Sequence, residues 1–69
     1  MRHLPSRLAR ALRRERQRRG WTQETAAEAT GMYVRHYQKL EEGSVNATLR
    51  TLERVCGGFG MDVRDLFSA

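Results

Sequence analysis

Three hydrogen-bond donors lie close together between residues 33 and 42, where the chain has the pattern of a short helix. Arg35, Gln38 and Lys39 are three and four residues apart, so on a helix they share the side away from Tyr37 and Leu40. All three side chains donate to base acceptors or to phosphate oxygens. A projecting helix of about ten residues fits the major groove of DNA. The pattern therefore predicts a helix that contacts double-stranded DNA.

Other chemistry has little support in the residue pattern. The hydroxyls of Thr22, Ser44 and Ser68 have no His–Asp pattern that would indicate nucleophilic catalysis. His3 and His36, with one cysteine, make no recognisable metal site. A chain of 69 residues is also too short to hold both a deep substrate cavity and a separate core. We therefore expect no enzyme activity, no metal and no cofactor.

Positive charge is concentrated at the N-terminal end of the chain. The net charge is +5, yet residues 1–20 hold eight arginines and one acid, whereas residues 21–69 hold five basic residues and seven acids. This distribution favours an anionic partner, with nucleic acid first. The excess of arginine over lysine suits bidentate contacts to phosphate and guanine, and is equally explained by GC-rich codons. The lone Cys56 and the absence of a leader or membrane span predict a cytoplasmic protein.

Four glycines divide the chain into segments of helical character. Gly20, Gly31, Gly43 and Gly60 each follow such a segment, as C-terminal helix caps do. No stretch alternates with the period of a strand. We therefore predict one compact all-α domain over residues 1–69, without a sheet. Its five short helices are expected at about residues 5–19, 22–30, 33–42 and 48–59, and from residue 62.

The second and third predicted helices have the features of a helix-turn-helix. Gly31 permits a tight turn between them, and the small side chains of Ala26 and Ala27 allow a close, steep approach. Thr22 is a candidate N-cap, and the helix that it starts offers backbone N–H groups and the Gln23 side chain to a phosphate.

Four stretches of this sequence, read in order, resemble one family. They are GWTQETAAEATG at residues 20–31, LEEG at 40–43, NATLRTL at 46–52 and GMDVRDLF at 60–67. Together they resemble the lambdoid-phage Cro/repressor-type helix-turn-helix family, also called the Xre family. The family includes phage repressors, antitoxins and restriction–modification controller proteins, and the resemblance is ungapped over about residues 6–67. It implies a lambda-repressor-like domain of five helices, of which the third contacts the bases.

The resemblance also implies roles for individual residues. Gln23 would bond a backbone phosphate, and Arg16 would pair with Glu41 to hold the third helix against the first. Base edges would face Tyr33, Val34, Arg35 and Lys39, and His36 would lie beside the sugar–phosphate backbone. With the donors found above and the arginines of the first helix, the predicted DNA-contacting set is Arg16, Arg19, Thr22, Gln23, Tyr33, Val34, Arg35, His36, Gln38 and Lys39.

Some residues depart from the family pattern. Ala26 and Thr30 stand where bulkier aliphatic residues are usual, and we expect the Tyr37 ring to fill the volume that they leave. Gly57 and Gly58 interrupt the fourth helix, at a cost of about 1 kcal/mol each relative to alanine. They have two interpretations: a tolerated irregularity, or close packing at a dimer interface.

The leading hypothesis is a sequence-specific transcription regulator that binds an inverted-repeat operator as a homodimer. One short helix contacts few bases, so two-fold pairing doubles the contacts. The C-terminal end is more apolar than so small a core needs, which predicts a dimer surface of Phe59, Met61, Val63, Leu66 and Phe67. The alternative is a protein-interaction module, such as an antitoxin that masks a partner protein.

Overall fold

The computed structural model describes residues 4–67, and these fold into five α-helices without a strand. In chain order they are α1 (Leu4–Arg18), α2 (Gln23–Thr30), α3 (Val34–Glu42), α4 (Leu49–Phe59) and α5 (Val63–Leu66). Each helix lies within a residue or two of the segment predicted from the sequence. The all-α prediction is therefore confirmed.

The starts of α2, α4 and α5 are set by local hydrogen bonds. The Thr22 hydroxyl accepts from the backbone N–H of Thr25 at 3.0 Å, and the Thr48 hydroxyl accepts from that of Thr51 at 3.1 Å. Asp62 and Asp65 form a capping box around the start of α5. Such caps satisfy backbone N–H groups that have no partner one turn earlier in the helix.

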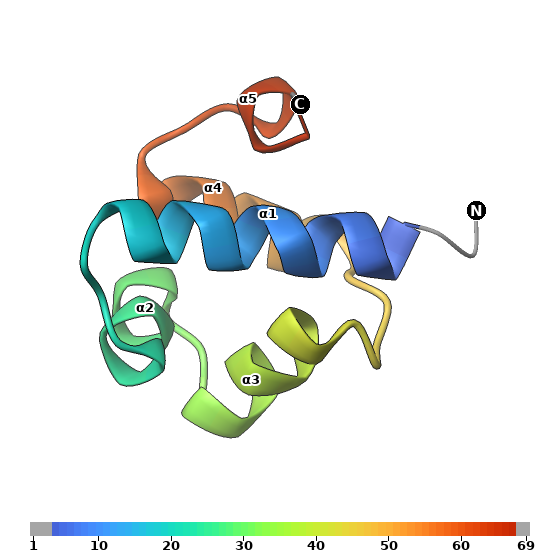
Figure 1. The fold of residues 1–69 in the computed structure, drawn as a ribbon. Coiled ribbons are helices and arrows are strands. Elements are labelled where there is room, and N and C mark those ends of the chain that lie inside the picture. The colour runs from blue at the N-terminus through green and yellow to red at the C-terminus, as the bar shows by residue number, and fades with distance from the viewer. Residues whose placement is uncertain (1–3, 68–69) are drawn as a thin grey trace.

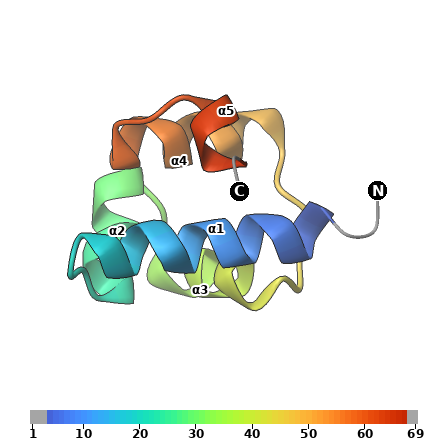
Figure 2. The same cartoon turned by 45° about the horizontal axis from the view of Figure 1, so that its top comes forward.

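Helix α1 is the element on which the others are assembled. It crosses the middle of the molecule, with α2 and α3 on one side and α4 and α5 on another (Figure 1). After a turn of 45° that brings the top of the molecule forward, α3 still lies behind and below α1, and α5 lies above it (Figure 2). An α1 side chain therefore faces the helix-turn-helix, the α4–α5 pair or solvent, according to its position around the helix.

The core lies where these elements meet. The largest side chains fully buried in it are Leu12, Tyr37, Leu40, Val55 and Leu66. Tyr37 is buried as predicted, together with Ala26 and Thr30. A large ring and small neighbours thus share one core, as the proposed compensation in volume requires.

Helical spacing in the sequence predicts that Leu49, Leu52, Val55 and Cys56 face inward, and the inward face of α4 differs from that prediction. Thr51, Val55 and Phe59, spaced four residues apart, are the buried residues of this helix. Leu52 and Cys56 flank that face, and Leu49 is 81% exposed although its spacing suggested an inward position. The core contact runs along the 51–55–59 line, so Leu49 falls outside it.

The two glycines of α4 have different surroundings. Gly58 lies against the backbone of Ala29 and the side chain of Thr30, whereas a Cβ on Gly57 would meet nothing within 4 Å. Close packing was predicted as one interpretation of this pair, at an interface between two copies. The structure shows that Gly58 serves close packing within the chain, between α2 and α4.

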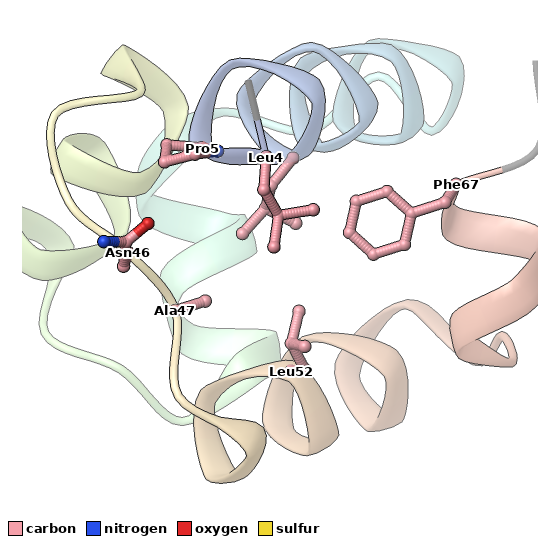
Figure 3. Close-up of a pocket in the computed structure, with 7 residues that line it drawn as sticks. Leu4, Pro5, Asn46, Ala47, Leu52 and Phe67 are labelled. Carbon is pink, nitrogen blue, oxygen red and sulfur yellow. The ribbon is translucent and has the colours of Figure 1, made fainter. Parts of the chain in front are cut away.

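A small apolar hollow remains between the start of α1, the α3–α4 connection, α4 and the end of α5. Its volume is about 50 Å³, and Leu4, Leu52, Ala47 and Phe67 point toward it (Figure 3). Asn46 is the only polar side chain among its lining residues. A space of this size and lining holds no substrate, so we regard it as a packing defect.

Candidate nucleic-acid interface

Helices α2 and α3 form the helix-turn-helix of this fold. Gly31 ends α2 with φ of 70°, a left-handed conformation that glycine adopts without the steric cost that other residues pay. Only Met32 and Tyr33 separate Gly31 from the first residue of α3. The short connection turns the chain sharply, and α3 comes to lie at the edge of the molecule (Figure 1).

One face of α3 is directed outward. Tyr33 is 89% exposed, and Val34, Arg35, His36 and Lys39 are exposed beside it. Over the part of the chain that is described, neither Arg35 nor Lys39 has an ion-pair partner. Three side chains that can donate or accept hydrogen bonds, those of Arg35, His36 and Lys39, are therefore available to a ligand, together with the aromatic ring that precedes the helix.

The opposite face of α3 is fixed to α1 through a buried ion pair. Arg16 Nε lies 2.6 Å from Oε2 of Glu41, and a second guanidinium nitrogen lies 3.2 Å from Oε1. The same guanidinium donates to the backbone carbonyl of Trp21 at 3.1 Å, and Arg13 donates to the backbone carbonyl of Glu41. These bonds hold the end of α3 against the first helix.

The ion pair also sets the charge state of Glu41. Burial raises the pKa of its carboxyl, but the hydrogen bonds from Arg16 and Gln23 and the neighbouring Tyr37 outweigh burial, so the pKa lies below its ordinary value. The Tyr37 hydroxyl is buried beside this pair without a hydrogen bond of acceptable geometry to any described residue. Burial and the Glu41 charge raise its pKa, so it stays protonated.

Two predicted DNA-contacting side chains at the α2–α3 junction bond to each other. Gln38 was expected to point outward with Arg35 and Lys39, but it is half-buried and its Nε2 lies 3.2 Å from Oε1 of Gln23. Gln23 in turn donates to Oε1 of Glu41 at 3.1 Å. The prediction that Gln38 points outward was wrong, because this residue lies next to Tyr37 at the boundary of the buried face.

Arg19 was expected beside the DNA, but in the structure its side chain is directed toward Glu15 and Phe59. It donates to the Glu15 carboxylate at 2.9 Å and to the backbone carbonyl of Phe59 at 2.6 Å. Its guanidinium lies 5.0 Å from the centre of the Phe59 ring and 5.5 Å from that of Trp21. Arg19 therefore joins α1 to α4, and α3 packs against a different side of α1.

Glu15 is a buried acid that three arginines surround. Its side chain is 3% exposed and bonds to Arg14, Arg18 and Arg19 at 2.9 to 3.1 Å. Three of the eight N-terminal arginines thus compensate one buried carboxylate, a role that the sequence analysis did not predict. The signal available in the sequence was the single acid among eight arginines.

The predicted dimer surface needs correction at two positions. Phe59 and Leu66 are 4% and 0% exposed, because Phe59 stacks on Trp21 and Leu66 closes the core over α1. Met61 and Phe67 are half-buried, and Val63 is exposed. An open apolar groove of about 450 Å³ lies instead between α4 and α5, with Leu49, Cys56, Met61 and Val63 among its lining residues.

Residues 4–67 contain neither a metal-type cluster nor a membrane-spanning helix. These residues hold no group of three or more potential ligands arranged for a metal ion. None of their helices combines the length and the apolar character that crossing a bilayer requires. The hydrogen-bonding face of α3 is thus the best-developed candidate site in the described chain.

A compact helical domain that fixes one helix of a pair and exposes the other defines a class of DNA-binding proteins. The chain belongs to the helix-turn-helix domain family, whose model matches residues 7–68. Members of this class bind DNA, so DNA is the partner that the family assigns to this chain. The comparisons with curated proteins and with solved structures gave no match.

Proposed function

We propose that this protein is a sequence-specific transcription regulator of the Cro/repressor type. The observation that supports it most is the division of α3 into two faces. Tyr37, Leu40 and Glu41 are buried, whereas Arg35, His36 and Lys39 are exposed beside Tyr33 and Val34. A rigidly held helix that directs unpaired donors outward suits insertion into a major groove.

Within this proposal the exposed residues have distinct roles. Arg35 contacts a guanine, and Lys39 contacts a guanine or a phosphate. Gln23, the first residue of α2, donates to a backbone phosphate, which helps to set the orientation of the domain on the duplex. Thr22 lies at the same helix start but already uses its hydroxyl to cap α2.

The proposal includes pairing of two copies on an inverted-repeat operator, with half-site centres about 34 Å apart or a multiple of that distance. We place the contact between copies at the groove between α4 and α5. Residues 49–65 carry three arginines and three acids, whereas residues 1–20 carry eight arginines and one acid. Pairing through residues 49–65, whose charges balance, keeps the positively charged N-terminal helices of the two copies apart. A two-fold interface also lets opposite charges on its rim meet.

Selection of bound sequences from a random duplex pool tests this function directly. We expect an inverted repeat to be enriched. The affinity of the protein for it should fall steeply as salt concentration rises: the logarithm of the binding constant should decrease against the logarithm of salt concentration with a slope of about 0.9 per phosphate contact. A selection that enriches no sequence, or binding that does not respond to salt, would contradict the proposal.

A further inference from the structure

The side-chain amide of Gln38 belongs to a continuous run of hydrogen bonds. It donates to Oε1 of Gln23, and Gln23 donates through Nε2 to Oε1 of Glu41. The run leaves α3 at Gln38, passes through the first residue of α2 and returns to α3 at Glu41. Arg16 closes it from α1 by binding the same carboxylate.

The direction of this run is fixed by chemistry. An ionised carboxylate only accepts hydrogen bonds, so Gln23 must present its NH₂ group to Glu41. Glu41 is ionised, because its bonds to Arg16 and Gln23 hold its pKa below the ordinary value in spite of burial. The carbonyl oxygen of Gln23 must then face Gln38, and Gln38 must offer its own NH₂ group to it.

This direction matters for what α2 presents to a ligand. The Gln23 amide nitrogen carries two hydrogens, and one of them is donated in the hydrogen bond to Glu41. The other is left at the start of α2, where the first backbone N–H groups have no partner within the helix. Rotation of the amide by half a turn would put an oxygen there instead, and that oxygen would repel a phosphate.

We propose that Gln38 is a positioning residue that acts through Gln23. By donating to the Gln23 oxygen, it holds that amide with an N–H, rather than a carbonyl, toward the DNA backbone. Gln38 itself contacts no base. The inference rests on the proposed DNA-binding function and replaces the direct DNA contact that the sequence indicated for this residue.

A double-mutant cycle tests this role on the duplex enriched by selection. Gln38→Met keeps the length of the side chain but removes its donors, and Gln38→Ala serves as a second variant. We expect either change to weaken binding about three- to tenfold, the usual value of one neutral hydrogen bond. The loss should be equal across all duplex sequences and should disappear when Gln23 is already alanine.

Gln17→Met provides the matched control. Gln17 is exposed on α1, so the same chemical change there should leave affinity unaltered. Thermal unfolding followed by circular dichroism is recorded for every variant. A residue that only stabilised α3 would lower the melting temperature and would weaken binding equally in both Gln23 backgrounds.

Each other outcome contradicts the inference. A relaxed preference at one base pair in Gln38→Met would make Gln38 a base-contacting residue. A loss that persists in the Gln23→Ala background, or no loss at all, would also overturn it. If the unmodified protein binds no duplex, the proposed function fails first, and that result is seen before any variant is made.

Discussion

Gly58 approaches Ala29 so closely that a Cβ on residue 58 would lie 2.6 Å from the Ala29 carbonyl oxygen. That distance is well inside van der Waals contact, and the atom that it meets is backbone, which cannot rotate away. The packing of α4 on the helix-turn-helix therefore depends on the absence of a side chain at one position.

The adjacent glycine supplies a matched comparison. Gly58→Ala should lower the free energy of unfolding by about 1–3 kcal/mol, because α4 must move away from α2. Gly57→Ala should raise it by about 1 kcal/mol, because alanine is the better helix former and nothing lies near the new methyl group. Urea unfolding of both variants measures the difference. Equal effects of the two substitutions would contradict the assigned close contact.

Arg35→Ala should relax the preference for one base pair in each half-site, at a cost of about 1–3 kcal/mol in binding free energy. The guanidinium is exposed on α3 and is not needed to hold the fold, so the melting temperature should not change. Competition binding against duplexes altered at single positions measures the preference. Arg10→Ala removes an exposed arginine from α1 as the control, and an unchanged preferred site in Arg35→Ala would count against base contact.

Arg19→Ala should act on stability rather than on DNA binding. The change removes a bond to the Phe59 carbonyl, a bond to the buried Glu15 and the stacking on two rings. We expect the free energy of unfolding to fall by about 1–3 kcal/mol. Affinity measured well below the melting temperature should stay within about twofold. A large loss of affinity in a fully folded variant would restore Arg19 to the DNA interface.

Stability should fall as the solution becomes acidic. Burial raises the pKa of Glu15, but its bonds to Arg19 and Arg14 and the charge of Arg18 outweigh burial and bring the pKa below its ordinary value of 4.5. The pKa of Glu41 is lowered in the same direction. A carboxyl with a lowered pKa in the folded state stabilises that state above its unfolded pKa, and this contribution is lost as pH falls below it.

Urea unfolding at pH 7, 6, 4.5 and 3 checks this expectation. The free energy of unfolding should be similar between pH 7 and 6 and should decrease below about pH 4.5. Glu15→Gln should be less stable at pH 7 and should show a weaker dependence on pH. A free energy that does not change down to pH 3 would mean that these carboxylates are not compensated as the structure indicates.

Self-association is tested at the α4–α5 groove. Val63→Glu places a charge among the apolar residues that line it, and by symmetry it does so twice in a dimer. We expect the dissociation constant of the dimer to rise at least about tenfold. Sedimentation velocity over a range of concentrations measures this dissociation constant. Val34→Glu introduces the same charge on α3, outside the groove, and serves as the control. A chain that is monomeric at high micromolar concentration would refute the dimer.

The fold was largely accessible from the sequence because its signals are local. Thr22 and Thr48 cap helices, four glycines end them, and Tyr37 and Leu40 mark the inner side of α3. Each of these depends on residues within one or two turns. The periodicity of a short helix was sufficient to place five elements in one all-α domain.

The errors arose where a residue's role depends on a distant partner. Gln38 turns inward because Gln23, fifteen residues earlier, accepts its hydrogen bond, and Arg19 turns to Phe59, forty residues later. Phe59 and Leu66 were assigned to a dimer surface because the sequence does not show that α4 and α5 pack over α1 and bury both side chains. Helical spacing gives the face of a residue but not which neighbour that face will meet.

The exposure of Arg35, His36 and Lys39 has a consequence for how such a protein can change. These side chains contribute almost nothing to holding the domain together, since the ion pair, the core and the caps lie elsewhere. A lineage, or an engineer, can therefore exchange them to acquire new target sites while the scaffold persists. Positions 37, 40 and 41 lack that freedom, because their side chains are buried and a substitution there would destabilise the fold.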